Sequence, residues 1–227
     1  YAVMVVSELI SAFRRDAGDA VKPYFFTDKD VIAWLNEAED EACERARLIF
    51  DGTNQAICKL PFNAGARFAR LHPSILEVVD AKWVTADTGA TQALRLTSRM
   101  HEETSGAFGR SSSDTGLPVL ASHDEGMLAL WPIPNVAGHV WLQCYRRPVS
   151  QMDKPCDSPE IQEQHHKYLI QYALHRAFEV PDAETFDSTR SEKALKVFER
   201  RFGPREMATV ARRSRADSPR VNPAFSW

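Results

Sequence analysis

The sequence has few cysteines and no long hydrophobic run, and each shortage excludes a class of protein. Its four cysteines are spread over 227 residues with no CxxC pair and no paired histidines nearby. This density does not support a disulfide framework and favours a reducing, cytosolic setting. No apolar run approaches the roughly 18 residues that a membrane helix needs. The first ten residues are too short and too weakly flanked for a signal peptide, and because they lack an initiator methionine, we expect that a few residues are missing or have been removed.

The sequence also has no excess of basic over acidic residues. The formal net charge of -3 argues against a general nucleic-acid binder, which is usually basic overall. The charge is unevenly distributed, however. Residues 1–50 hold six Lys/Arg against ten Asp/Glu, whereas residues 201–227 hold six against two. An acidic front and a basic tail indicate self-association or docking onto another subunit.

Helical patterns occupy both ends of the chain. Residues 27–49 form an amphipathic helix in which Thr27 is the N-cap and Asp30 is the acid of a capping box. The apolar stripe of this helix repeats at spacings of three and four: Val31, Leu35, Ala38, Ala42, Ala46 and Ile49. The same signals predict further helices at 3–17, 158–180, 182–202 and 205–215. Ser158 and Pro159 are the expected start of the helix at 158–180.

Between these helical ends, short β-branched and aromatic runs alternate with turn residues. The predicted strands are 56–60, 78–85, 93–96, 119–122, 127–131 and 140–145. Residues 104–116 form a Gly/Ser-rich loop, after a weak helix at 98–103. The fold class is therefore α+β. We expect a helical body from 1–54 and 150–213, a mostly antiparallel β insert at 55–149, and an extended C-terminal arm at 214–227.

No catalytic, metal or cofactor motif stands out. Glu163 and His166 have the Glu-x-x-His spacing, but a di-iron site needs a second such pair, which the sequence lacks. The triplets 101–103 and 123–125 are acidic and contain histidine, yet their adjacent side chains point in different directions, so solvated turns are the better interpretation. Nucleophile elbows and phosphate loops are missing. The sequence predicts no enzyme, no metal and no cofactor.

Two charged clusters remain as candidate sites. The helix at 27–49 carries a carboxylate face made of Glu37, Asp40 and Glu44. This face is either an ordinary solvated surface or an acidic surface that meets a basic partner or repels passing DNA. The second cluster lies near the C-terminus and consists of Arg212, Arg213, Arg215, Phe225 and Trp227. It suits a helix C-terminus, a phosphate contact or a docking tail, and its aromatic residues favour docking into a protein groove.

Three stretches together resemble the head-to-tail connector (adaptor) proteins of tailed bacteriophages. The first is VSELISAFRRDAGD followed by FTDKDVIAWLNEAEDEACERA. The second is LALWPIPNVAGHVWLQCYRRPV, two strands around a Trp-Pro-x-Pro turn. The third runs from EIQEQHHKYLIQYALHRAFEV to ALKVFERRFG. Together they cover about half of the chain in the expected order.

The resemblance implies a structural virion protein at the head–tail interface, made in the cytoplasm of the host bacterium. Such proteins form a ring, commonly of twelve copies, below the portal protein. The ring continues the channel for double-stranded DNA without binding it specifically, and it anchors tail tube, nozzle or fibre proteins. By this resemblance the C-terminal arm docks on the portal, and the carboxylate face lines the channel or meets a neighbouring copy. The competing hypothesis is a helical regulatory or DNA-binding protein that uses its Arg-rich end.

Overall fold

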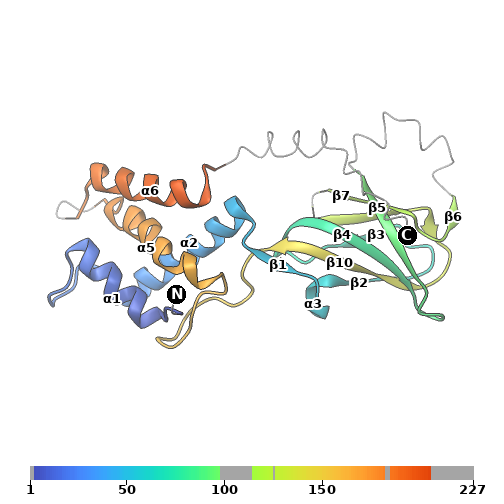
Figure 1. Ribbon diagram of the computed structural model, residues 1–227, viewed down its shortest axis with the longest axis horizontal. Helices are drawn as coiled ribbons and strands as arrows, with labels where there is room; N and C mark the ends of the chain where they lie inside the picture. The colour runs from blue at the N-terminus through green and yellow to red at the C-terminus, as the bar shows by residue number, and fades with distance from the viewer. Residues whose placement is uncertain (1–2, 98–113, 125, 182–184, 206–227) are drawn as a thin grey trace, which may run out of the picture. The chain divides into compact units, whose positions relative to one another are not determined.

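The computed structural model describes residues 3–97, 114–124, 126–181 and 185–205, and it confirms the mixed α+β class. Two compact units divide the chain. A helical unit combines residues 1–50 with 145–205, and a β unit contains residues 51–144 (Figure 1). The helical unit is therefore built from the two ends of the described chain.

The first two helices begin and end largely where the sequence places them. Helix α1 spans Val6–Ala17 and ends at Gly18, whose φ of 81° is the left-handed conformation that favours glycine. Helix α2 spans Asp28–Ala46, and the Thr27 side chain accepts a hydrogen bond from the backbone N–H of Asp30. The predicted N-cap is thus confirmed.

The end of α2 differs from the prediction. The helix stops at Ala46, because Arg47 adopts a left-handed φ of 53° and its N–H bonds back to the carbonyl of Cys43. Ile49 then belongs to strand β1, Ile49–Asp51, and not to the helical stripe. Ile49 is buried in the strand, as it would be on the apolar stripe of a helix, so apolar spacing alone does not distinguish helix from strand at this residue.

The β unit is one curled sheet with a small two-stranded addition. The sheet has eight strands in the order β1-β10-β4-β5-β7-β8-β3, and β2 pairs with β10 off this path. Its members are β2 (Lys59–Phe62), β3 (Phe68–Arg70), β4 (Ile75–Thr85), β5 (Thr91–Thr97), β7 (Leu120–Asp124), β8 (Met127–Trp131) and β10 (Gly138–Arg146), together with β1. The addition pairs β6 (Thr115–Gly116) with β9 (Ile133–Pro134).

Alternation along the strands builds the core of this unit. In β10, Val140, Leu142 and Cys144 are fully buried, as their spacing predicts. They join a cluster that includes Trp83 and Leu128 from neighbouring strands. The backbone of Gly138 approaches Trp83 closely, because an added Cβ atom would lie 2.5 Å from the Trp83 ring and from the Val84 carbonyl oxygen.

All six predicted strand regions contain a strand. The structure corrects the start of the first one, adds four strands and shows two parallel pairings. Residues 55–58 form a helical turn, α3 (Gln55–Cys58), because the Asn54 side chain caps it, and the strand begins only at Lys59. Four short strands were not predicted at all: β1, β3, β6 and β9. Most pairings are antiparallel, but β5–β7 and β6–β9 are parallel.

Two further helices complete the helical unit. Helix α5 (Glu163–Phe178) is central, since it contacts α1, α2 and α6 (Ser188–Phe202) extensively. The prediction that α5 starts at Ser158 is wrong. The backbone N–H groups of Glu160 and Ile161 donate to a side chain of α2, and the helix begins two residues later. Helix α6 begins at Ser188, after the N-cap Asp187, and not at residue 182 as predicted.

Several predictions concern residues outside the described part of the chain. These are the weak helix at 98–103, most of the loop at 104–116, and the arm at 214–227. The predicted helix at 205–215 also falls there, apart from Arg205, which is not helical. Among the helices that the structure describes, none is long and apolar enough to cross a membrane.

Candidate functional site

The predicted carboxylate face lies on α2 and is partly neutralised by arginines of the same chain. The Glu37 carboxylate accepts a hydrogen bond from the Tyr172 hydroxyl at 3.0 Å and from Arg176 Nε at 3.1 Å, both on α5. Its side chain remains 44% exposed. Glu37 therefore ties α2 to α5 and still faces solvent.

The other two predicted carboxylates lie near one arginine. Glu44 forms an ion pair with Arg147 at 2.5 Å. Burial raises the pKa of Asp40, and the nearby Arg147 charge partly opposes this shift. Glu41 forms an ion pair with Arg45 at 2.8 Å, which places another carboxylate of α2 in an intrachain contact. The face thus keeps a net negative charge that arginines reduce but do not cancel.

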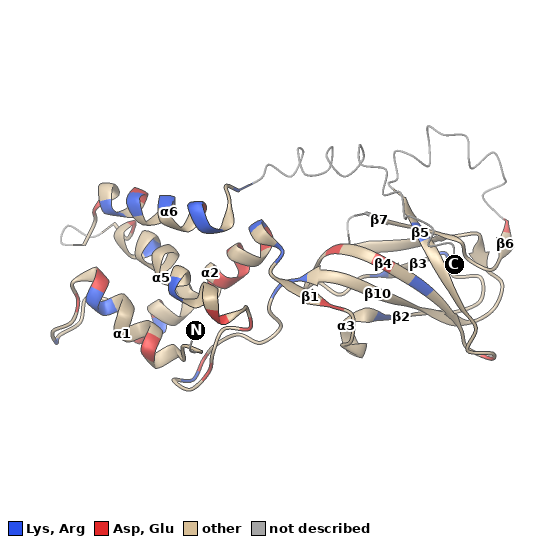
Figure 2. Ribbon diagram, in the orientation of Figure 1, with Lys and Arg blue, Asp and Glu red and all other residues tan. Residues whose placement is uncertain are grey.

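Figure 2 shows that charge is segregated within the helical unit, with acidic residues concentrated on α2 and basic residues along α6. Lys193, Lys196 and Arg200 are exposed and lie at spacings of three and four, so they share one face of α6. In the described part of the chain, only Lys196 of these three has an ion-pair partner, Glu192 at 3.7 Å. The sequence interpretation did not single out this basic row.

A shallow groove of about 360 Å³ lies beside the basic row. Its walls come from three helices: Met4 precedes α1, Ala12 lies on α1, Tyr168 and Ile170 lie on α5, and Val197 lies on α6. Arg15, Asp16, Lys167 and Gln171 line its more polar parts. Val197 is 37% exposed, so this face of α6 offers an apolar contact among its cations.

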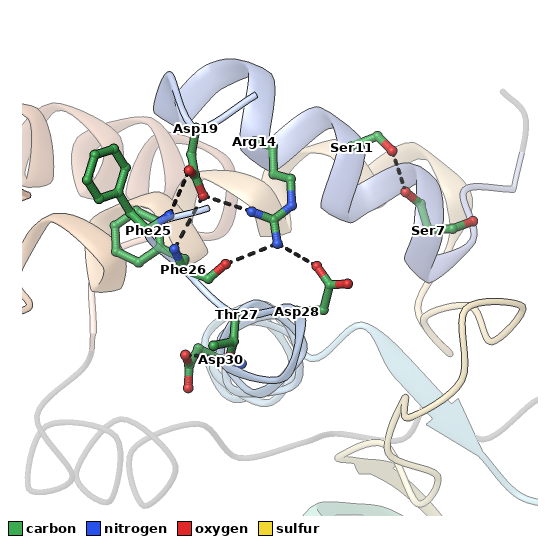
Figure 3. A network of polar contacts seen from close by, with 9 residues as sticks. All are labelled: Ser7, Ser11, Arg14, Asp19, Phe25, Phe26, Thr27, Asp28 and Asp30. Atoms are coloured by element: carbon green, nitrogen blue, oxygen red, sulfur yellow. Dashed lines mark hydrogen bonds and ion pairs between the residues drawn. The ribbon is translucent and has the colours of Figure 1, made fainter. Parts of the chain in front are cut away.

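The loop between α1 and α2 is fixed by a buried arginine (Figure 3). Arg14 donates to Asp19 Oδ2 at 2.8 Å and to the Phe26 carbonyl at 3.0 Å, and it pairs with Asp28 at 2.5 Å. The Tyr24 ring stacks on its guanidinium at 3.6 Å. Asp19 in turn accepts from the backbone N–H groups of Phe25 and Phe26.

This fixed loop exposes apolar side chains to solvent. Val21 is 81% exposed and Phe25 is 62% exposed, although Phe26 between the helices is buried. Phe26 packs edge-on against Phe13 and Trp34, which anchors the loop from inside. A rigid segment with an exposed aromatic ring suits docking, because little conformational entropy remains to be lost on binding.

The sequence did not predict that one carboxylate of α2, Glu39, is buried. Glu39 is 1% exposed, and its Oε1 accepts from the backbone N–H groups of Glu160 at 2.6 Å and Ile161 at 3.0 Å. Burial raises its pKa to about 7, although these hydrogen bonds favour the charged form. The signal was present: Glu39 lies four residues after Leu35 and three before Ala42, on the apolar stripe.

Glu39 holds part of an irregular segment, residues 147–162, against α2. Asn36 makes two reciprocal hydrogen bonds with the backbone of Met152, each 2.9 Å long. Glu160 binds Arg146 at 2.5 Å and accepts from the N–H of Val149. These contacts order a segment that has no regular secondary structure of its own.

His166 has a structural role. Its Nδ1 accepts from the backbone N–H of Met4 at 3.2 Å, so Nε2 carries the proton that it donates to the Ile161 carbonyl at 2.9 Å. The ring therefore attaches the start of the chain to α5. Glu163, its partner in the Glu-x-x-His spacing, is exposed at the start of the helix. In the described ranges, no group of three or more His, Cys, Asp or Glu could hold a metal ion.

The basic C-terminal candidates lie outside the described residues. These are Arg212, Arg213, Arg215, Phe225 and Trp227. The last basic residue that the structure describes, Arg205, pairs with Glu41 of α2 at 3.5 Å. The arm hypothesis therefore stays a prediction.

Comparison with known proteins gives one result. A family model described as SU10 adaptor protein matches residues 4–223, which is nearly the whole chain and includes both units. No curated protein matches the chain.

Proposed function

Because the chain belongs to the SU10 adaptor protein family, a family of phage structural proteins and not of enzymes, we propose that it forms the head-to-tail connector of a virion. The observation that carries the proposal is the length of the match, residues 4–223. A match of that extent includes the helical unit, the β unit and the segments between them, so the proposal applies to the molecule as a whole.

In this proposal several copies form a ring below the portal protein, and the ring continues the DNA channel and anchors tail tube, nozzle or fibre proteins. Twelve copies are the number that the family resemblance implies. A ring needs two different surfaces on each copy, one that meets the next copy and one that receives it. The segregated charge of the helical unit supports such an arrangement.

The most direct test is imaging of the full-length protein bound to a portal ring. We expect a closed ring with one face on the portal and an open axial channel. A protein that is missing from purified virions, or that binds no portal, would contradict the proposal. Immunoblotting of purified particles gives the same answer more quickly.

The carboxylate face is proposed to line the channel or to meet a neighbouring copy. Charge reversal of Glu37, Asp40 and Glu44 should impair DNA passage or ring assembly. Because Glu37 also binds Arg176, the matched control is Arg176→Gln, which loses that intrachain pair without adding positive charge. Normal assembly and infectivity of the triple variant would contradict this role.

Residues 214–227 are proposed to dock on the portal through Arg215, Phe225 and Trp227. Truncation after Arg213 should abolish portal attachment and leave the thermal melt of the remaining protein nearly unchanged. Attachment at wild-type affinity after truncation would show that the arm is not the anchor.

One observation favours a second candidate, a DNA-binding protein: the basic row of α6 faces solvent. Duplex DNA binding by the isolated protein that weakens steeply with salt would support it. The connector proposal instead expects weak binding, since a conduit must let DNA pass.

A further inference from the structure

The basic row of α6 is only weakly neutralised by the residues that the structure describes. Lys193 and Arg200 form no ion pair with any residue that the structure describes, and the side chain of Lys196 is 71% exposed beside Glu192. Exposed pairs of that kind contribute little to stability. The row is therefore free to bind an acidic surface.

An acidic surface of matching form lies on α2 of the same unit. Asp30, Glu37, Asp40 and Glu44 follow one another at spacings of seven, three and four, so they form one row along the helix. Arg176 and Arg147 neutralise only part of this row. Helix α5 packs extensively against both α2 and α6. The two rows of one copy are each fixed on a helix of the same packed unit.

We propose that the basic row of α6 in one copy binds the acidic row of α2 in a second copy. This contact is heterologous, because the two surfaces differ, and such contacts join copies head to tail. The proposal rests on the proposed function in one respect: a ring is the closed form of such a chain of contacts. It goes further by naming the two surfaces and their residues.

Apolar groups lie near each row and supply the contact that charge alone does not. The groove beside the basic row contains Tyr168 and Val197. The exposed Phe25 lies two residues before the N-cap of α2, at the end of the acidic row nearest Asp30. An aromatic ring that enters a groove between cations is typical of the centre of a protein interface.

Charge-swapped variants of the full-length chain test the contact. The basic-row variant is Lys193→Glu/Lys196→Glu/Arg200→Glu, and the acidic-row variant is Asp30→Lys/Glu37→Lys. Sedimentation measures the self-association of each alone and of the two mixed. Each alone should self-associate at least about tenfold more weakly than wild type, because like charges then face each other. Self-association should recover in the mixture, because the acidic α6 of one variant can bind the basic α2 of the other.

The matched control is Lys59→Glu/Lys82→Glu/Arg95→Glu, which changes the net charge as much as the basic-row variant does. Its three side chains are exposed on the β unit, so self-association should remain at the wild-type level. Phe25→Asp, at an exposed position, should weaken self-association without lowering the thermal melt.

Three outcomes would overturn the proposal. The first is wild-type self-association by either row variant, or no recovery on mixing. The second is a wild-type chain that stays monomeric up to about 1 mM, where even weak contacts are populated. The third is a basic-row variant that self-associates normally and loses only salt-dependent duplex binding. These outcomes leave the connector function untouched. That function would be contradicted by the absence of the protein from purified virions.

Discussion

Charged groups lie inside the helical unit, whereas the interior of the β unit is apolar. Among the described residues, the buried Arg, Asp, Glu and His side chains of the helical unit are Arg14, Asp19, Glu39, Glu41, Arg146, His165 and His166. Only Asp51 is comparable in the β unit, and it lies at the first residue of that unit. The β unit instead packs Trp83, Leu128 and Leu130 at 1% exposure or less.

This difference follows from how each unit is assembled. The described residues of the β unit all lie between 51 and 144, and its neighbouring strands satisfy each other's backbone groups. The helical unit joins distant segments through irregular connections, whose backbone N–H and C=O groups need partners. Buried side chains such as Arg14 and Glu39 supply these partners. The helical unit should therefore respond to charge and pH, and the β unit to changes in volume.

The largest expected effect is the removal of a buried charge from the helical unit. Arg14→Met leaves Asp19, whose side chain is 2% exposed, without its ion-pair partner. We expect a loss of about 3–5 kcal/mol in the free energy of unfolding, measured by chemical denaturation. Hydrogen exchange should increase in peptides from α1 and α2 and remain unchanged in those from β4 and β10.

Arg15→Met is the matched control, because its side chain is 74% exposed and it is the next residue along. That variant should stay within about 0.5 kcal/mol of wild type. Equal losses from the two variants would remove the contrast between the units.

A smaller effect is expected from pH, and it should arise in the helical unit. Burial raises the pKa of Glu39 from 4.5 to about 7, so the folded state binds a proton that the unfolded state releases between these values. Stability from this group therefore falls as pH rises from about 4.5 to 7 and is constant outside that window. Glu39→Gln should remove this fall, which is on the order of 3 kcal/mol.

Denaturation of wild type and Glu39→Gln at several pH values measures the difference directly. Glu37→Gln is the control, since that carboxylate is 44% exposed. This variant should retain the fall in stability that Glu39 causes between about pH 4.5 and 7. A Glu39→Gln profile parallel to wild type between pH 5 and 8 would show that the buried carboxylate is not the source.

The smallest of the three effects is steric and belongs to the β unit. In Gly138→Ala the new Cβ atom lies 2.5 Å from the Val84 carbonyl oxygen, so the backbone must shift. Overpacking of this kind costs about 1–3 kcal/mol. Gly116→Ala is the control, because its nearest atom is 3.8 Å away in the Pro132 ring. If both glycines tolerate alanine equally in thermal melts, packing does not limit this unit.

The sequence predicted the elements whose signals are local. The N-cap at Thr27 and the strand at 140–145 each depend on a few adjacent residues, and each was confirmed. The false start of α5 at Ser158 shows the limit of such signals. Its cap pattern was sound, but the N–H groups of residues 160 and 161 bond to Glu39, which is 121 positions away from the first of them.

For the same reason, the sequence predicted the carboxylates of the candidate site but not their partners. The carboxylates of α2 were found by their helical spacing, but their partners Arg176 and Arg147 are far away in sequence. The basic row of α6 has the same spacing signal, but its three cations are spread over eight residues, whereas Arg212, Arg213 and Arg215 lie within four. Long-range pairing needs the fold, since spacing along the chain does not show which faces meet.

The division of the helical unit between the two ends of the chain has a consequence for synthesis. Helices α1 and α2 leave the ribosome before the helix that packs against both of them, because α5 begins at Glu163, more than a hundred residues later. At bacterial rates of elongation this delay lasts on the order of ten seconds. All the described strands precede α5 in the chain, so they are synthesised before it. The nascent chain therefore carries α1, α2 and the described strands before α5 and α6 are made and complete the helical unit.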